Sequence, residues 1–205
     1  MTNPTRCLAL AALFAVGCGA DEPIRTYETL KPAEYASPPP PSPDYRLLGA
    51  MFPAEEPEWF FKTTGKAAQL AKYEAEFDKL LTSVRFVPDK DKVPQLPTFT
   101  APADWVRTGP RTVRSGGIAL QIDETLRFGP PDDPLEITVT QAKGGNTERN
   151  VSRWADQVGY RYTKYSDLKK VCQEVKGDGV VGLRVDAAGM KNPAAPRGPM
   201  SGMGR

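Results

Sequence analysis

Proline limits where this chain can fold, because the residue fixes φ and has no backbone N–H to donate within a helix or a central strand. Residues 21–44 contain seven prolines, four of them consecutive from Pro38 to Pro41. This stretch favours extended polyproline II structure and is interpreted as a spacer, with a PxxP-type recognition ligand as the alternative. Residues 191–205 are rich in glycine, proline and small side chains, which predicts a disordered tail. A packed core is therefore expected in residues 45–190, as a single domain.

The N-terminal segment has the pattern of an export signal. One arginine precedes ten apolar residues, Cys7 to Val16, a run too short to span a bilayer, which takes about 20 residues. Small residues then lead to a cysteine, in the order Ala15-Val16-Gly17-Cys18. This arrangement resembles the lipobox of bacterial lipoproteins. The resemblance implies that residues 1–17 are removed and that lipid is attached to Cys18.

Lipid on Cys18 would determine where the protein is located. Each buried methylene of an acyl chain contributes ~0.8 kcal/mol, so several chains together give stable anchoring. Residues 18–44 are then a lipidated N-terminus and linker, and the domain belongs to the cell envelope, facing the periplasm or the exterior. Ordinary signal cleavage after Ala20, which would remove Cys18, is the alternative. The domain itself contains a single cysteine, Cys172, so an internal disulfide is excluded and a packed core must supply its stability.

Composition excludes several classes of function. The chain contains no histidine, which excludes a Ser-His-Asp triad, a Cys-His dyad and imidazole metal ligands. Its formal net charge is only +2, which argues against a nucleic-acid binder that relies on phosphate contacts. We expect no cofactor and no metal site.

Hydrophobic periodicity predicts an α+β domain. Apolar residues at helical spacing predict a helix over residues 66–84, and two shorter helices over 151–158 and 166–176, the last with Ser166 as N-cap and Gly177 as its end. Strands are expected at 45–52, 58–63, 118–122, 135–141 and 180–187, and one more begins at Trp105. Because strands and helices do not alternate one by one, a mainly antiparallel sheet with helices packed on it is favoured over a parallel sheet.

Three segments together resemble a family of uncharacterised bacterial lipoproteins that is common in planctomycete genomes. They are RLLGAMFPAEEPEWFFKTTG, APADWVRTGPRTVR and NVSRWADQVG. No activity is assigned to that family. More distantly, the segments resemble PsbP-like αβα sandwiches, with the hairpin and long helix moved to the start of the domain, as in a circular permutation. This resemblance implies a mostly non-catalytic accessory or assembly function, and it predicts that strands 45–52 and 180–187 lie side by side.

Two sets of residues are candidates for catalysis. Cys172 has no histidine to activate it and shares an apolar stripe with Leu168 and Val175, so a core position is favoured. The acidic pairs are Asp132-Asp133, which lies between prolines, and Asp89 with Asp91, which lies between lysines. These surroundings favour turns over a metal or catalytic site.

Basic and aromatic residues occur together at two places. The first group is Arg107, Arg111 and Arg114, and the second includes Lys164. Candidate binding residues around the second group are Arg153, Tyr160, Arg161, Tyr162 and Tyr165. Tyrosine and arginine are enriched at the centres of protein interfaces, so we expect a protein or glycan partner rather than nucleic acid. A solvated loop between two helices is the alternative.

The leading hypothesis is a lipid-anchored extracytoplasmic binding or assembly module without catalysis, held on a membrane by its N-terminal lipid and acting with an envelope protein partner. The alternative is a small carboxylate-dependent enzyme that acts on envelope carbohydrate. A third possibility is a structural envelope protein. A cleft holding carboxyl groups with raised pKa values would favour the enzyme.

Overall fold

The computed structural model describes residues 42–86, 96–115, 118–143 and 145–190. Within these ranges, seven strands form one sheet: β1 (Tyr45–Phe52), β2 (Trp59–Lys66), β3 (Val106–Thr108), β6 (Glu124–Phe128), β7 (Leu135–Gln141), β8 (Cys172–Lys176) and β9 (Val181–Gly189). Their order is β3-β6-β7-β2-β1-β9-β8, and all neighbours are antiparallel. Strands β4 (Arg111–Ser115) and β5 (Ile118–Ile122) pair separately. This architecture confirms the α+β class with a mainly antiparallel sheet.

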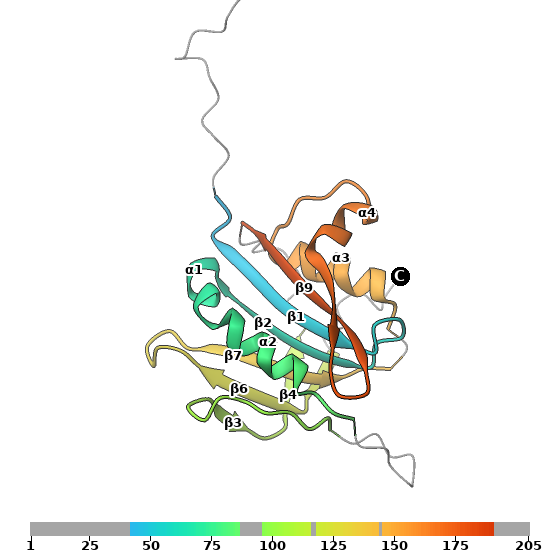
Figure 1. The fold of residues 1–205 in the computed structure, drawn as a ribbon. Helices are drawn as coiled ribbons and strands as arrows, with labels where there is room; N and C mark the ends of the chain where they lie inside the picture. The colour runs from blue at the N-terminus through green and yellow to red at the C-terminus, as the bar shows by residue number, and fades with distance from the viewer. Residues whose placement is uncertain (1–41, 87–95, 116–117, 144, 191–205) are drawn as a thin grey trace, which may run out of the picture. The chain divides into compact units, whose positions relative to one another are not determined.

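Helices cover both faces of the sheet (Figure 1). One face carries α1 (Ala67–Leu70), the 3-10 turn η2 (Ala71–Tyr73) and α2 (Glu74–Thr82). The other face carries α3 (Thr147–Gln157), α4 (Tyr165–Leu168) and the 3-10 turn η3 (Lys169–Val171).

The alternation of side chains along β1 divides the apolar residues into two cores. Leu48 and Phe52 join the core under α2, whereas Leu47 and Met51 join the core under α3. Both sets are fully buried, because β1 lies in the middle of the sheet with helices on either side. A strand buried on both faces has a nearly continuous apolar sequence, which is what YRLLGAMF shows.

Strand β1 pairs with β9 over most of its length. The register runs from Tyr45 opposite Gly189 to Met51 opposite Leu183. The expected adjacency of residues 45–52 and 180–187 is therefore confirmed. The start and the end of the domain thus lie on neighbouring strands.

The predicted helix over residues 66–84 is confirmed in outline, but a 3-10 turn separates α1 from α2. Its apolar stripe, which includes Leu70, Phe77 and Leu81, is buried. Helix α3 starts earlier than predicted, at Thr147, because the side chain of Asn146 accepts a hydrogen bond from the backbone N–H of Arg149 at 2.9 Å and caps the helix.

The predicted helix over residues 166–176 is wrong in its second half. Residues 172–176 form β8, which pairs with β9. Lys164 rather than Ser166 occupies the N-cap position of the short α4, where its backbone N–H donates to Asp167 Oδ2. The apolar spacing from Leu168 to Val175 fits a helix, but residues 172–176 instead pair with the free edge of β9 as a strand. In this strand Val175 and Cys172 face opposite sides of the sheet. Strands β4, β6 and β8 were not expected from the sequence.

An ion-pair cluster seats α2 on the sheet. From the sheet, Arg46 bonds Asp186, and Arg184 lies 3.3 Å from the same carboxylate. From α2, Glu74 bonds both arginines at 2.7 and 2.8 Å, and Asp78 bonds Arg184 at 2.7 Å. Burial opposes ionisation of Asp186, but the hydrogen bond and charge of Arg46, together with those of Arg184, lower the pKa of its carboxyl. Each of the two guanidinium groups therefore has carboxylate partners.

Replacement of Gly49 by alanine is expected to destabilise the fold by about 1–3 kcal/mol, because a small-to-large change in a packed core forces its neighbours to move. A Cβ at Gly49 would lie 2.4 Å from the Trp154 ring, which is itself buried. The measurement is the free energy of unfolding in urea. Gly109→Ala is the matched control, because nothing lies within 4 Å of its Cβ position. Equal stabilities of the two variants would contradict the close approach of Trp154 to the sheet.

Candidate functional site

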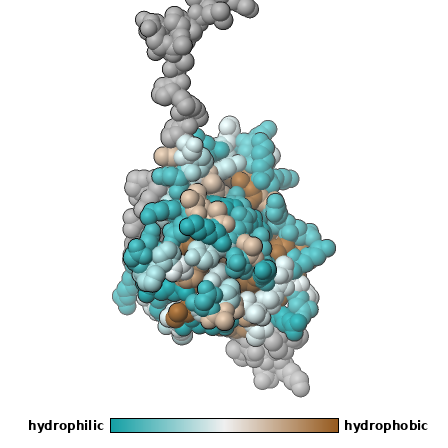
Figure 2. All heavy atoms as spheres, turned by 60° about the vertical axis from the view of Figure 1, so that its left-hand side comes forward, coloured by the Kyte–Doolittle hydropathy of each residue, from teal (hydrophilic) through white to brown (hydrophobic). Residues whose placement is uncertain are grey.

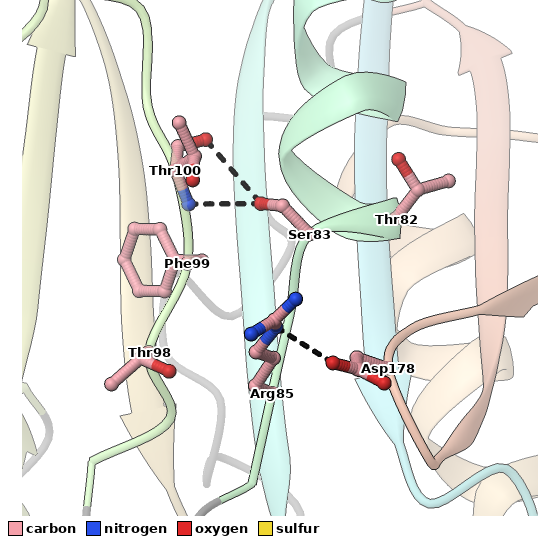
Figure 3. Close-up of a pocket in the computed structure, with 7 residues that line it drawn as sticks. All are labelled: Thr82, Ser83, Arg85, Thr98, Phe99, Thr100 and Asp178. Carbon is pink, nitrogen blue, oxygen red and sulfur yellow. Dashed lines mark hydrogen bonds and ion pairs between the residues drawn. The ribbon is translucent and has the colours of Figure 1, made fainter.

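An open hollow of about 420 Å³ lies where the end of α2 meets residues 98–100 and the turn before β9 (Figure 3). Several of its polar side chains already have partners within the fold. Ser83 Oγ accepts from the Thr100 backbone N–H at 2.8 Å, and Arg85 Nε lies 2.7 Å from Asp178 Oδ2. Both members of the Arg85–Asp178 pair are more than half exposed, so the pair contributes little stability. The hollow is best explained as the junction of three segments.

The acidic candidates are separated. Asp132 and Asp133 are exposed, and Asp133 Oδ2 bonds Lys66 Nζ at 2.7 Å, which holds the β6–β7 turn to the start of α1. Asp89 and Asp91 lie outside the described residues. Across the described ranges, no three His, Cys, Asp or Glu side chains gather where they could hold a metal ion.

Glu124 is the one described carboxyl group whose pKa is raised. The cause is burial, which the charge of Arg107 opposes, and Arg107 Nη1 lies 3.1 Å from Glu124 Oε1. An enzyme that uses two carboxyl groups needs a second one facing the first. Asp123, the neighbouring acid in sequence, instead accepts a hydrogen bond from the Gln141 backbone N–H.

The first basic group is distributed over two strands. Arg107 lies on β3, pairs with Glu124 and stacks over the Phe99 ring at 4.6 Å. Arg111 lies on β4 and bonds Glu136 of β7 at 2.7 Å, which ties the β4–β5 hairpin to the sheet. Arg114 is exposed on β4. These arginines therefore do not form one surface.

The tyrosines of the second group are half-buried. Tyr160, Tyr162 and Tyr165 all pack against the core under α3, while Arg161 is exposed. The Tyr162 hydroxyl bonds side chains of α3, and burial is the main reason that its pKa is raised. The tyrosine rings therefore hold the loop after α3 against the core, and the exposed side chains of this loop are mainly charged.

Arg153 lies in a different environment, on a polar stripe of α3. Asn150, Arg153 and Gln157 recur at spacings of three and four residues, which places them on one side of the helix. Arg153 Nη2 donates to Asn150 Oδ1 at 2.5 Å. Gln157 Oε1 accepts from Nζ of Lys62, on β2, at 3.2 Å. The stripe therefore faces β2, next to the apolar stripe of α3 that contains Trp154.

The sheet presents a transverse row of residues beneath this stripe. Thr125 of β6 is opposite Thr138 of β7, Thr138 is opposite Lys62, and Lys62 is opposite Gly49 of β1. The absence of a side chain at Gly49 lets the Trp154 ring lie directly on the strand. The Thr125 hydroxyl is buried without a hydrogen-bond partner. The row thus has an apolar contact at Gly49 and polar side chains at Lys62, Thr138 and Thr125.

Lys62 and Arg153 are cations in an unfavourable environment. Both side chains are half-buried. Burial lowers the pKa of Lys62 to about 8, and the charge of Arg153 adds to the effect. Burial likewise lowers the pKa of Arg153 to about 10, with a further contribution from Arg149. Since no carboxylate raises either pKa, the fold bears a cost of a few kcal/mol for keeping these charges.

Two donors beside these charges lack partners. Arg153 Nε and Gln157 Nε2 are buried and make no hydrogen bond. A buried donor without a partner is costly, and native structures contain few of them. We define Lys62, Arg153 and Gln157 as the α3 cationic cluster. Its surplus of donors and positive charge makes it the best candidate for a binding site among the described residues.

The sequence pointed to Arg153 but missed Lys62 and Gln157. The available signal was a lysine inside the aromatic strand WFFKT, where a charged side chain must face either a core or a partner. The hydrogen bond to Gln157, which is 95 residues away in the chain, could not be inferred from local pattern.

Apolar residues do not form a broad patch on the face in Figure 2, where small apolar areas lie among hydrophilic side chains. The large exposed apolar residues come from separate segments: Leu96, Val106, Val113, Val181 and Met190. Scattered residues of this kind are ordinary for a protein surface. Recognition through polar groups is therefore better supported than recognition through an apolar face.

Comparison of the chain with protein-family models, with curated proteins and with solved structures gives no match. The resemblances to bacterial lipoproteins and to PsbP-like sandwiches therefore stay predictions. None of the helices in the described ranges has the length and apolar character needed to span a membrane. Cys18 and the proline-rich linker lie outside the described residues.

Lys62→Met is expected to raise the free energy of unfolding at pH 7 by about 1–3 kcal/mol, because it removes a charge from a poorly solvated position. The pKa of Lys62 is about 8 in the folded protein against 10.5 ordinarily, so the unfolded chain binds more protons between these values. The free energy of unfolding of the wild type should therefore increase relative to that of the variant as pH rises from 8 towards 10. Urea unfolding over this range is the measurement.

Two features make this comparison specific. The Cys172 thiol, whose pKa burial raises to about 11, contributes equally to the wild type and the variant and cancels from the difference. Lys79→Met, at an exposed position on α2, should leave the pH dependence of the wild type unchanged. Parallel curves for wild type and Lys62→Met would show that the ammonium group is fully solvated.

Proposed function

We propose that the protein is a lipid-anchored, extracytoplasmic binding or assembly module without catalysis. In this proposal Cys18 carries the lipid, residues 18–44 extend from the membrane, and the α+β domain presents the α3 face to an envelope partner. The N-terminal pattern supports the anchor, and the α3 cationic cluster supports a binding face.

The single observation that carries the binding function is the pairing of unfavourable charge at Lys62 and Arg153 with unpartnered donors at Arg153 and Gln157. An apolar side chain at either position would relieve the cost, so the two charges themselves do not stabilise the fold in isolation. A ligand that accepts hydrogen bonds and carries negative charge would offset the cost on binding. The arrangement is therefore better explained by binding than by stability.

Catalysis is less well supported at this cluster. A lysine with a lowered pKa also suits covalent chemistry, but such a lysine needs a neighbour that transfers protons. Side chains near Lys62 include the amide of Gln157, the hydroxyl of Thr138 on the adjacent strand and the guanidinium of Arg153. None of these groups titrates near neutral pH. For the alternative, an enzyme that uses carboxyl groups, Glu124 is the one described carboxyl group with a raised pKa, and it is paired with Arg107. The binding module therefore remains the better proposal.

Cys18→Ser is expected to abolish lipid attachment and release the protein from membranes, because the serine hydroxyl does not replace the thiol that is acylated. The measurement is metabolic labelling with a fatty acid, together with membrane fractionation of cells that express the full chain. Cys172→Ser is the matched control, since this cysteine belongs to the folded domain, and it should keep both label and membrane association. Equal labelling of the two variants would exclude Cys18 as the anchor.

A photo-reactive amino acid placed at Glu148, exposed on α3, is expected to cross-link one discrete envelope partner in cells. The same amino acid at Lys79, exposed on α2 at the opposite face of the sheet, is the control and should give no such product. Mass spectrometry of the detergent-extracted adducts identifies the partner. The same products from both positions, or recovery of free protein from both, would contradict a binding face at α3.

A further inference from the structure

We propose that the α3 cationic cluster binds an oxyanion, a carboxylate or phosphate group, between Lys62 and Arg153. This inference rests on the proposed function, because it names the chemistry that the binding face recognises. The group would accept hydrogen bonds from the two cations and from the amide of Gln157.

The hydrogen bonds already present orient the cluster for this purpose. Lys62 Nζ donates to Gln157 Oε1 at 3.2 Å, which uses the acceptor end of the amide and leaves its NH₂ group as a donor. Arg153 Nη2 donates to Asn150 Oδ1, which fixes one edge of the guanidinium, while Nε remains without a partner. Asn150 and Gln157 thus supply their oxygens to the cations, and what remains unsatisfied is a set of N–H donors.

An oxyanion matches this set better than other ligands do. A metal cation is disfavoured, because the cluster offers donors and positive charge rather than oxygen ligands. A neutral hydroxyl ligand would accept hydrogen bonds but would leave the two charges uncompensated. A carboxylate or phosphate group carries several acceptor oxygens and a negative charge, and charge-assisted hydrogen bonds to arginine and lysine are among the strongest in proteins.

The electrostatics of the neighbourhood agree with this assignment. The charge of Arg153 lowers the pKa of Lys62, and the charge of Arg149 lowers that of Arg153, so three cations influence one another along α3 and β2. No carboxylate acts on either pKa. In contrast, the arginines of the cluster under α2 are held by Glu74, Asp78 and Asp186.

Carboxylate and phosphate ligands share this chemistry, and two probes separate them. Inorganic phosphate and acetate are each titrated into the purified full-length protein in detergent, against chloride at equal ionic strength. The first measurement is the pKa of Lys62, followed through the ¹³C shift of its ε carbon. We expect the better probe to raise this pKa by about one unit or more, because a bound anion favours the charged ammonium.

The second measurement is the affinity of the better probe for four variants. Arg153→Gln and Lys62→Met each remove a charge, and Gln157→Leu removes the amide while both charges stay. We expect each to weaken binding by about tenfold or more, because each removes a charge-assisted or amide hydrogen bond to the anion. Arg161→Gln, which removes a charge from the exposed loop after α3, should bind as the wild type does.

The outcomes separate this proposal from the proposed function. A rise in the Lys62 pKa with one probe, lost in Arg153→Gln but kept in Arg161→Gln, supports the site and identifies the oxyanion. Failure of both probes to shift the Lys62 pKa, or equal binding by all four variants, overturns it. Because Lys62→Met is expected to fold at least as well as the wild type, loss of binding there is not loss of fold. A discrete cross-linked partner at Glu148 without anion binding would leave the binding module intact and reject the oxyanion alone.

Discussion

Strand β1 lies between β2 and β9, and its two hydrogen-bonded edges join the first and the last parts of the domain. This strand is buried on both faces, so each of its alternate side chains is required by one of the two cores. A slip of one residue in its register would exchange the residues of the two cores and place Arg46 against α3. The positions of α2 on one face and of α3 on the other therefore both depend on the register of β1.

The same register explains how the α3 cationic cluster arises. Gly49 leaves room for Trp154, which brings α3 close to the middle of the sheet. Lys62 is opposite Gly49 on the neighbouring strand, so its side chain emerges beside the Trp154 contact and reaches Gln157. The lysine therefore lies beside the contact between Trp154 and Gly49, which belongs to the core under α3. Its poor solvation follows from the packing of α3, and the same packing brings Arg153 near it.

How much of this could be predicted from the sequence depended on the range of the interaction involved. The helix stripe from Leu70 to Val84 and the pattern of LEITVTQ are local, and both were confirmed. The helix expected through Cys172 was wrong, because its apolar spacing also suits a strand and only the edge of β9 decides between them. At the candidate site, Arg153 carried a local signal. Lys62 also had one, as a lysine within WFFKT, but its contact with Gln157 could not be inferred, because that contact depends on the register across the sheet and on the packing of α3.

The two charged clusters of the domain provide an internal comparison. Arg46 and Arg184 lie on the α2 face, and there the chain supplies three carboxylates, so the pKa of Asp186 is lowered and the pKa values of both arginines are raised. Lys62 and Arg153 lie on the α3 face and are half-buried like Arg46, yet there the pKa shifts have the opposite sign. Carboxylates thus neutralise the cations that hold α2 on the sheet, whereas no carboxylate neutralises those of the α3 cationic cluster. Because the chain places carboxylates beside buried arginines on one face, the lack of acidic influence on Lys62 and Arg153 is better explained by a negative charge that comes from a ligand.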